Sequence, residues 1–164
     1  MDSDKTPTPT GLDIFIATGA FAGFASVAPG TVGSAWGIPL TLAVRSLPGE
    51  FWWIAFTLGL CLLGVPLCTR VANRLSQKDP GAIVWDEIAS MPLVFLFIPD
   101  SLLWNPWILL MGFGLHRVFD ISKLPPTNLL ERLPDGAGIM ADDISAALYG
   151  CVALHLMIWL MGLS

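Results

Sequence analysis

Apolar runs separated by short polar segments dominate this sequence and restrict the folds that it can adopt. A helix needs about 20 mainly apolar residues to cross a bilayer, and fewer where it is short or re-entrant. Hydrophobic residues make up 54% of the 164 residues, which is more apolar surface than a soluble domain of this size can bury. The runs that we interpret as membrane helices cover residues 35–47, 51–68, 82–98, 102–119 and 144–163.

We therefore expect an all-α, polytopic helical membrane protein of about five or six helices. Residues 12–28 form a possible further helix, but they are rich in Gly and Ala, which permit close packing inside a bundle. The sequence leaves open whether this segment crosses the membrane. Residues 1–11 are expected to be a disordered leader, and residues 12–164 a single membrane-embedded domain.

Charge, cysteine and histidine content exclude several classes of function. The net charge is −5 and no basic stripe is present, so we expect no nucleic-acid partner. The three cysteines lie inside apolar runs without metal-ligand or redox spacing, and we expect them to pack as small hydrophobes. His116 and His155 are too few for a phosphatase with a histidine nucleophile. Since His155 lies deep in the last run, we expect it to be a hydrogen-bonded packing residue.

The distribution of basic residues predicts how the helices are oriented. If all five runs cross the membrane, the polar segments alternate between its two sides. One side then receives six basic residues, and the other receives only Arg45. The six are Arg70, Arg74, Lys78, Arg117, Lys123 and Arg132. Because cytoplasmic loops carry the excess of Lys and Arg, we expect the polar motifs and the active site at the cytoplasmic interface.

Five acidic residues lie on this predicted face, at or inside the membrane boundary: Asp86, Glu87, Asp120, Asp142 and Asp143. An ionised carboxylate inside an apolar run costs several kcal/mol unless it is paired or binds a metal. Oxygen ligands with few histidines favour Mg²⁺ over Zn²⁺. Two simpler interpretations remain open. The helix over 82–98 could begin after Glu87 and leave an exposed acid pair, and Asp142 or Asp143 could cap the last helix.

Basic and hydroxyl side chains accompany the acids. Arg117 and Lys123 flank Asp120 and offer the charges that a phosphate monoester prefers. The alternative is that these neighbours only balance each other's charge. The loop expected over residues 29–34 adds backbone N–H groups and two hydroxyls, which favour phosphate binding. Alone, such a PGTVGS segment is more often only a turn.

Taken together, four segments resemble the phosphatidylglycerophosphatase A family. They are APGTVGS (28–34), DPGAIVWDE (79–87), RVFDISK (117–123) and GAGIMADD (136–143), in the family's order. The chain departs from the family pattern where Leu124 follows Lys123, and where Ala137 separates two glycines.

This resemblance implies a Mg²⁺-dependent, multi-pass enzyme of the bacterial inner membrane. Such an enzyme hydrolyses phosphatidylglycerophosphate to phosphatidylglycerol and phosphate, as a step of phospholipid biosynthesis. The implied partners are the phospholipid substrate and the bilayer, while the oligomeric state stays open.

The resemblance also carries residue roles onto this sequence. The expected metal ligands are Asp86, Glu87, Asp142 and Asp143. The expected catalytic residues are Asp86, Glu87 and Asp120, with Asp86 or Glu87 orienting or deprotonating the attacking water. The expected substrate-binding residues are Thr31, Gly33, Ser34, Arg117 and Lys123. Gly136 and Gly138 are expected to let the backbone turn, so that the last two acids meet the others.

Three alternatives use the same residues differently. An ion transporter with intramembrane carboxylates would distribute acids through the membrane depth and on both faces. A phosphatase of another lipid phosphate would need the same acids and bases. A nonenzymatic assembly subunit would need neither the acids nor the bases.

Overall fold

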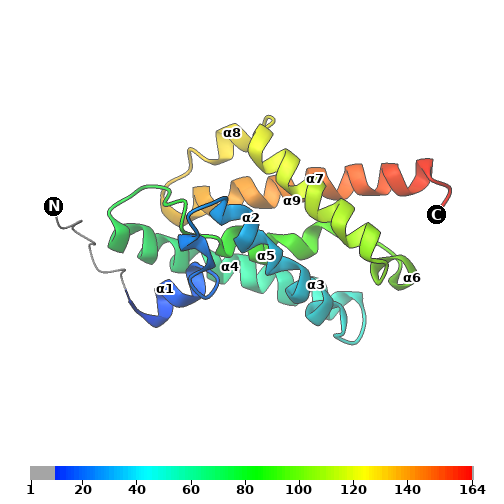
Figure 1. Ribbon diagram of the computed structural model, residues 1–164, viewed down its shortest axis with the longest axis horizontal. Helices are drawn as coiled ribbons and strands as arrows, with labels where there is room; N and C mark the ends of the chain where they lie inside the picture. The colour runs from blue at the N-terminus through cyan, green and yellow to red at the C-terminus, as the bar shows by residue number, and fades with distance from the viewer. Residues whose placement is uncertain (1–9, 164) are drawn as a thin grey trace.

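Helices and loops account for the whole of residues 10–163, which are the residues that the computed structural model describes, and no strand occurs among them. Most of the predicted leader, residues 1–9, lies outside this range. The helices form an elongated bundle (Figure 1). The helices are α1 (Leu12–Ala17), the 3-10 helix η1 (Ala22–Phe24), α2 (Pro29–Ala35), α3 (Gly37–Arg45), α4 (Glu50–Leu75), α5 (Trp85–Val94), α6 (Asp100–Leu103), α7 (Pro106–Ser122), α8 (Thr127–Leu130) and α9 (Asp135–Leu160). The all-α prediction is confirmed.

Helix α9 is the element around which the bundle is assembled, since it packs against α4, α5 and α7. Its first turns approach α4 at backbone distance: a Cβ on Gly136 would lie 2.2 Å from the carbonyl oxygen of Val65. The Gly136 N–H also donates to Thr69 Oγ1 at 2.9 Å. The expected turn at Gly136 and Gly138 is therefore wrong, because both glycines are helical. Small residues here serve close helix packing.

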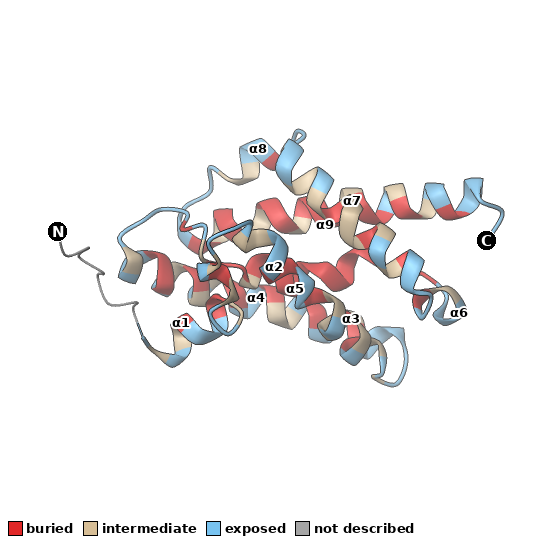
Figure 2. Cartoon of the chain, in the orientation of Figure 1, coloured by how far each residue is buried: buried red, intermediate tan, exposed pale blue. Residues whose placement is uncertain are grey.

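Helix α5 lies at the centre of the bundle and carries the first acid pair. Nine of its ten residues are buried, and Figure 2 shows it among the most buried elements. Ten residues extend only about 15 Å, so α5 is much shorter than the run predicted over 82–98. The chain leaves the helix at Phe95, and the neighbouring helices α3, α4 and α9 cover α5.

Two helices, α4 and α9, are long and apolar enough to cross a membrane, with 26 residues each. Both run along the long axis of the molecule (Figure 1). Only 28% and 44% of their most apolar stretches are buried, whereas the core helix of a soluble protein is mostly buried. Leu62, Val152 and Trp159 are among their exposed apolar side chains, as expected of a membrane-associated protein.

Fewer helices reach spanning length than the predicted five or six. In the described part of the chain, α3 has nine residues, α5 has ten and α7 has 17. The segment over 12–28 contains the six-residue α1 and the three-residue η1. Apolar runs predicted these helices, but the observed helices do not follow the bounds of the runs.

The close approach of α9 to α4 predicts that Gly136→Ala destabilises the protein. The new methyl group would meet backbone atoms of Val65 and Thr69, and overpacking of this kind costs roughly 1–3 kcal/mol. Gly59→Ala is the matched control, because a Cβ on this helical glycine meets nothing within 4 Å. Thermal unfolding in detergent should show a lower midpoint for Gly136→Ala only. Equal midpoints for the two variants would contradict this packing.

Candidate active site

Four helices that are distant in the sequence bring the predicted site residues together. Helix α2 contacts α5 and α7, and α9 contacts α5 and α7, so these four helices meet in one region (Figure 1). The residues are Ser34 from α2, Asp86 and Glu87 from α5, Arg117 and Asp120 from α7, and Asp142 and Asp143 from α9, with Lys123 directly after α7. We call this group the acid cluster.

Arg117 joins three of the four helices. Its Nη1 lies 2.9 Å from Glu87 Oε1 and 2.8 Å from Asp120 Oδ2. The same nitrogen is 3.4 Å from Ser34 Oγ, and Ser34 donates a hydrogen bond to Glu87 Oε2. Arg117 therefore holds α2, α5 and α7 in register through charge-assisted hydrogen bonds. No hydrogen bond of its Nη2 is found within residues 10–163.

Gly30 makes this arrangement possible. A Cβ at this position would lie 2.6 Å from Glu87 Oε1 and 3.0 Å from Arg117 Nη2, so any larger residue would displace one of the two groups. Gly30 was not among the predicted site residues. The only signal was its place in the PGTVGS segment, whose glycines we could not rank without a structure.

The PGTVGS segment is a helix and not the predicted loop. Helix α2 begins at Pro29, the position where proline favours helix initiation. Thr31 is exposed, and Gly33 packs against Val84, where a Cβ would lie 2.3 Å from Val84 Cβ. Among the three predicted substrate contacts of this segment, only Ser34 places its side chain against the acids in the described part of the chain.

The two acidic side chains of α5 are buried and point in different directions. Helix α5 begins at Trp85, so the interpretation as an exposed pair before the helix is wrong. Asp86 and Glu87 are 7% and 9% exposed. Successive helical residues point about 100° apart. Glu87 faces Ser34 and Arg117, while Asp86 lies beside Asp143 of α9.

The acid pair of α9 is also buried, two turns inside the helix. Asp142 and Asp143 are 5% and 3% exposed, and α9 begins at Asp135, so the capping interpretation is wrong. Asp142 Oδ2 lies 3.3 Å from Lys123 Nζ. Lys123 Nζ also contacts Glu131 Oε2 at 3.0 Å, a residue that the sequence analysis missed. Partial burial alone would lower the pKa of Lys123, but Glu131 and Asp142 raise it above its ordinary value, so Lys123 stays charged.

His116 reaches the acid cluster, whereas His155 does not. His116 is fully buried, and its Nε2 lies 3.7 Å from Asp143 Oδ1 and 3.2 Å from Ser90 Oγ. No sequence pattern pointed to Ser90. His155 Nδ1 lies 2.9 Å from the Cys151 carbonyl oxygen one turn earlier, which confirms it as a hydrogen-bonded packing residue.

The acid cluster has the chemistry of a cation site. Oδ1 of Asp86 and Oδ1 of Asp143 are buried and find no hydrogen-bond partner within the described residues. Five acids face two bases here, and buried carboxylates without a partner are costly. Hard oxygen donors of this kind suit Mg²⁺. No three His, Cys, Asp or Glu side chains of residues 10–163 stand in a preformed metal-binding arrangement.

Comparison with known proteins identifies the family. The model of the family described as Phosphatidylglycerophosphatase A matches residues 15–158. No solved structure matches the chain.

Three relatives are similar along nearly the whole chain. A Phosphatidylglycerophosphatase A from Haemophilus influenzae is 38% identical over 148 residues, covering 89% of each protein. One from Escherichia coli K12 is 33% identical over 142 residues, covering 85% of this chain and 80% of the relative. A Bacteroides thetaiotaomicron protein, whose name proposes phosphatidylinositol-3-phosphatase activity, is 30% identical over 157 residues, covering 94% and 98%. With a family match over most of its length and relatives at this identity, the chain belongs to the phosphatidylglycerophosphatase A family.

Proposed function

We propose that this protein hydrolyses phosphatidylglycerophosphate to phosphatidylglycerol and inorganic phosphate, as a step of phospholipid biosynthesis. Family membership and the names of two relatives support this activity. The observation that carries it is the acid cluster, in which buried carboxylates from α5 and α9 lie next to Arg117 and Lys123. Carboxylates beside phosphate-binding cations are what hydrolysis of a phosphate monoester requires.

Mg²⁺ is the cofactor that this site would hold. Asp86 and Asp143 are its first ligands, since each has a buried oxygen without a partner in the described chain. Asp142, which directly precedes Asp143 on α9, and Glu87 of α5 complete the set of carboxylates that would hold the ion. When bound, Mg²⁺ supplies Lewis-acid chemistry and offsets the negative charge of the phosphate oxygens.

The side chains of the cluster divide the remaining tasks. Arg117 binds the phosphate through Nη2, while Asp120 and Glu87 hold its Nη1 in place. Lys123, fixed between Asp142 and Glu131, adds a second positive charge. A carboxylate of α5 accepts a proton from the water that attacks phosphorus. The P–O bond to the lipid breaks, and the departing alkoxide oxygen takes up that proton to give the alcohol.

The site faces the cytoplasm in our proposal for a multi-pass protein of the bacterial inner membrane. Arg70 and Arg74 lie near the C-terminal end of α4. Lys123 directly follows α7, and Lys78 shares a small cavity with Glu131 and Asp135 at the start of α9. Arg45 lies in the last turn of α3, away from these residues, and pairs with Asp100. The excess of these basic residues over the side that holds Arg45 agrees with the positive-inside rule.

Two other functions fit less well. An ion transporter needs acids along a path through the membrane, but here the five acids gather in one cluster beside two cations. A phosphatase of another lipid phosphate is the closer alternative, because one relative carries the name of an inositol lipid phosphatase. Parallel assays on the two lipids decide between these substrates.

Removal of one carboxylate tests the site. Asp143→Asn should lower phosphate release from phosphatidylglycerophosphate by at least about 10²-fold, because the cluster loses a charge on which cation binding depends. Asp100→Asn is the matched control, since Asp100 is exposed and pairs with Arg45 away from the cluster. If Asp143→Asn keeps wild-type activity in purified form, the proposed site is wrong.

Metal removal tests the cofactor. EDTA should abolish phosphate release by the purified protein, and added Mg²⁺ should restore it. Asp86→Asn should require more Mg²⁺ for half-maximal restoration than the wild type does. Full activity in EDTA, after removal of bound metals, would rule out a metal-dependent reaction.

The close approach at Gly30 gives a test of Arg117 positioning. In Gly30→Ala the new methyl group would meet Glu87 Oε1 and Arg117 Nη2, and we expect kcat/KM to fall about 10²-fold because the guanidinium moves. The matched control is Gly114→Ala on α7, where a Cβ meets nothing within 4 Å. Unfolding midpoints of both variants should stay close to the wild type. Unchanged kinetics for Gly30→Ala would argue against a precise guanidinium position.

A further inference from the structure

We propose that the two acyl chains of the lipid substrate lie in two apolar grooves on either side of α3, while its phosphate lies at the acid cluster. This inference rests on the proposed lipid phosphatase function and adds the location of the chains. The α1–α3 groove is a cavity of about 450 Å³ lined by apolar residues that include Trp36, Leu40, Ala43, Trp85 and Ile88. The α3–α7 groove has about 360 Å³ and is lined by Ala35, Ile38, Pro106, Leu109, Leu110 and Phe113.

Both grooves are lined by residues that neighbour acid-cluster residues in the sequence or on the same helix. In the α1–α3 groove, Trp85 directly precedes Asp86 and Ile88 directly follows Glu87. In the α3–α7 groove, Ala35 directly follows Ser34, and Phe113 lies one turn before Arg117 on α7. In this proposal a lipid whose phosphate contacts Arg117 extends one chain along each side of α3.

The linings match acyl chains in chemistry and in size. No charged or hydroxyl side chain lines either groove. Both volumes fall within the range of small-molecule sites, about 300–1,000 Å³. Trp36 and Leu110 are exposed large apolar side chains, so the grooves open to the surroundings of the protein, where the lipid enters.

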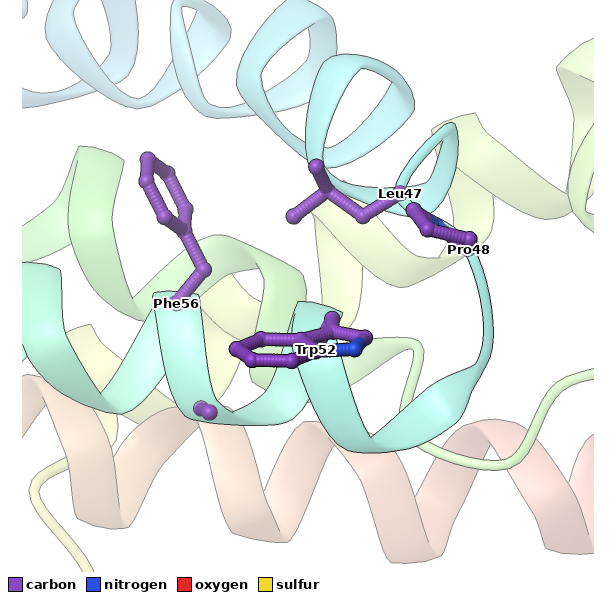
Figure 3. A pocket seen from close by; sticks show the side chains of 5 residues that line it. Leu47, Pro48, Trp52 and Phe56 are labelled. Atoms are coloured by element: carbon purple, nitrogen blue, oxygen red, sulfur yellow. The ribbon is translucent and has the colours of Figure 1, made fainter.

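A third groove shows that apolar character alone does not assign the substrate. It lies between α3 and α4, has about 420 Å³, and is lined by Leu47, Pro48, Trp52, Ala55 and Phe56 (Figure 3). Leu47 and Pro48 lie in the turn after α3, and the other three residues lie in the first two turns of α4, at the far end of α3 from Ser34. This groove lies away from the acid cluster, so it is the internal control. Bilayer lipid can cover its apolar surface, but the acyl chains of a substrate bound at the cluster do not occupy it.

Each groove contains at least one exposed alanine, which provides a matched set of variants. Ala35→Phe fills the α3–α7 groove, Ala43→Phe fills the α1–α3 groove and Ala55→Phe fills the control groove. Since all three alanines are exposed, the new rings do not enter the core. Unfolding midpoints check that the variants stay folded.

The experiment compares long-chain phosphatidylglycerophosphate in detergent with the same headgroup without acyl chains, used as a competitive inhibitor. We expect Ala35→Phe and Ala43→Phe to raise KM for the long-chain lipid about tenfold and to leave the inhibition constant of the headgroup unchanged. Ala55→Phe should change neither. Equal effects of all three variants, no effect of the first two, or a parallel rise in the inhibition constant would overturn the chain assignment. Absence of hydrolysis by the wild type would instead overturn the proposed function.

Discussion

The burial of carboxylates between α5 and α9 is the interaction on which the rest of the structure depends. Asp86, Glu87, Asp142 and Asp143 are all less than one tenth exposed, and each ionised group would cost several kcal/mol without a partner. Arg117 and Lys123 supply part of the compensation. The oxygens of Asp86 and Asp143 that lack a partner in the described chain create the demand for a cation. Stability of the bundle centre and the proposed chemistry therefore have the same electrostatic origin.

Close packing of backbones is the second condition for this site. Gly136 lets α9 approach α4, and Gly30 leaves room for the contact between Glu87 and Arg117. Neither position carries a chemical group, yet both decide where the reactive side chains lie. Since helices from four parts of the chain meet at the cluster, small displacements of one helix would separate acid from base.

Sequence patterns predicted much of the fold and of the residue set. Apolar runs gave the all-α class, and the acids and bases that we selected do gather in one cluster. Helix lengths could not be predicted equally well, because α5 is short and covered on all sides, whereas α9 extends through a segment that reads as a polar loop. Gly30, Ser90 and Glu131 were missed, since their roles depend on neighbours that are distant in the chain.

The sequence by itself determined the helical class, the apolar outer surfaces and the chemical types at the site, because these follow from local composition and periodicity. Only the tertiary structure decided what each acid does. Asp86 and Glu87 are adjacent and chemically similar, but their positions on α5 direct one toward Asp143 and the other toward Ser34 and Arg117. The physical reason is that side chains about 100° apart on a helix meet different neighbours, and those neighbours are fixed by packing.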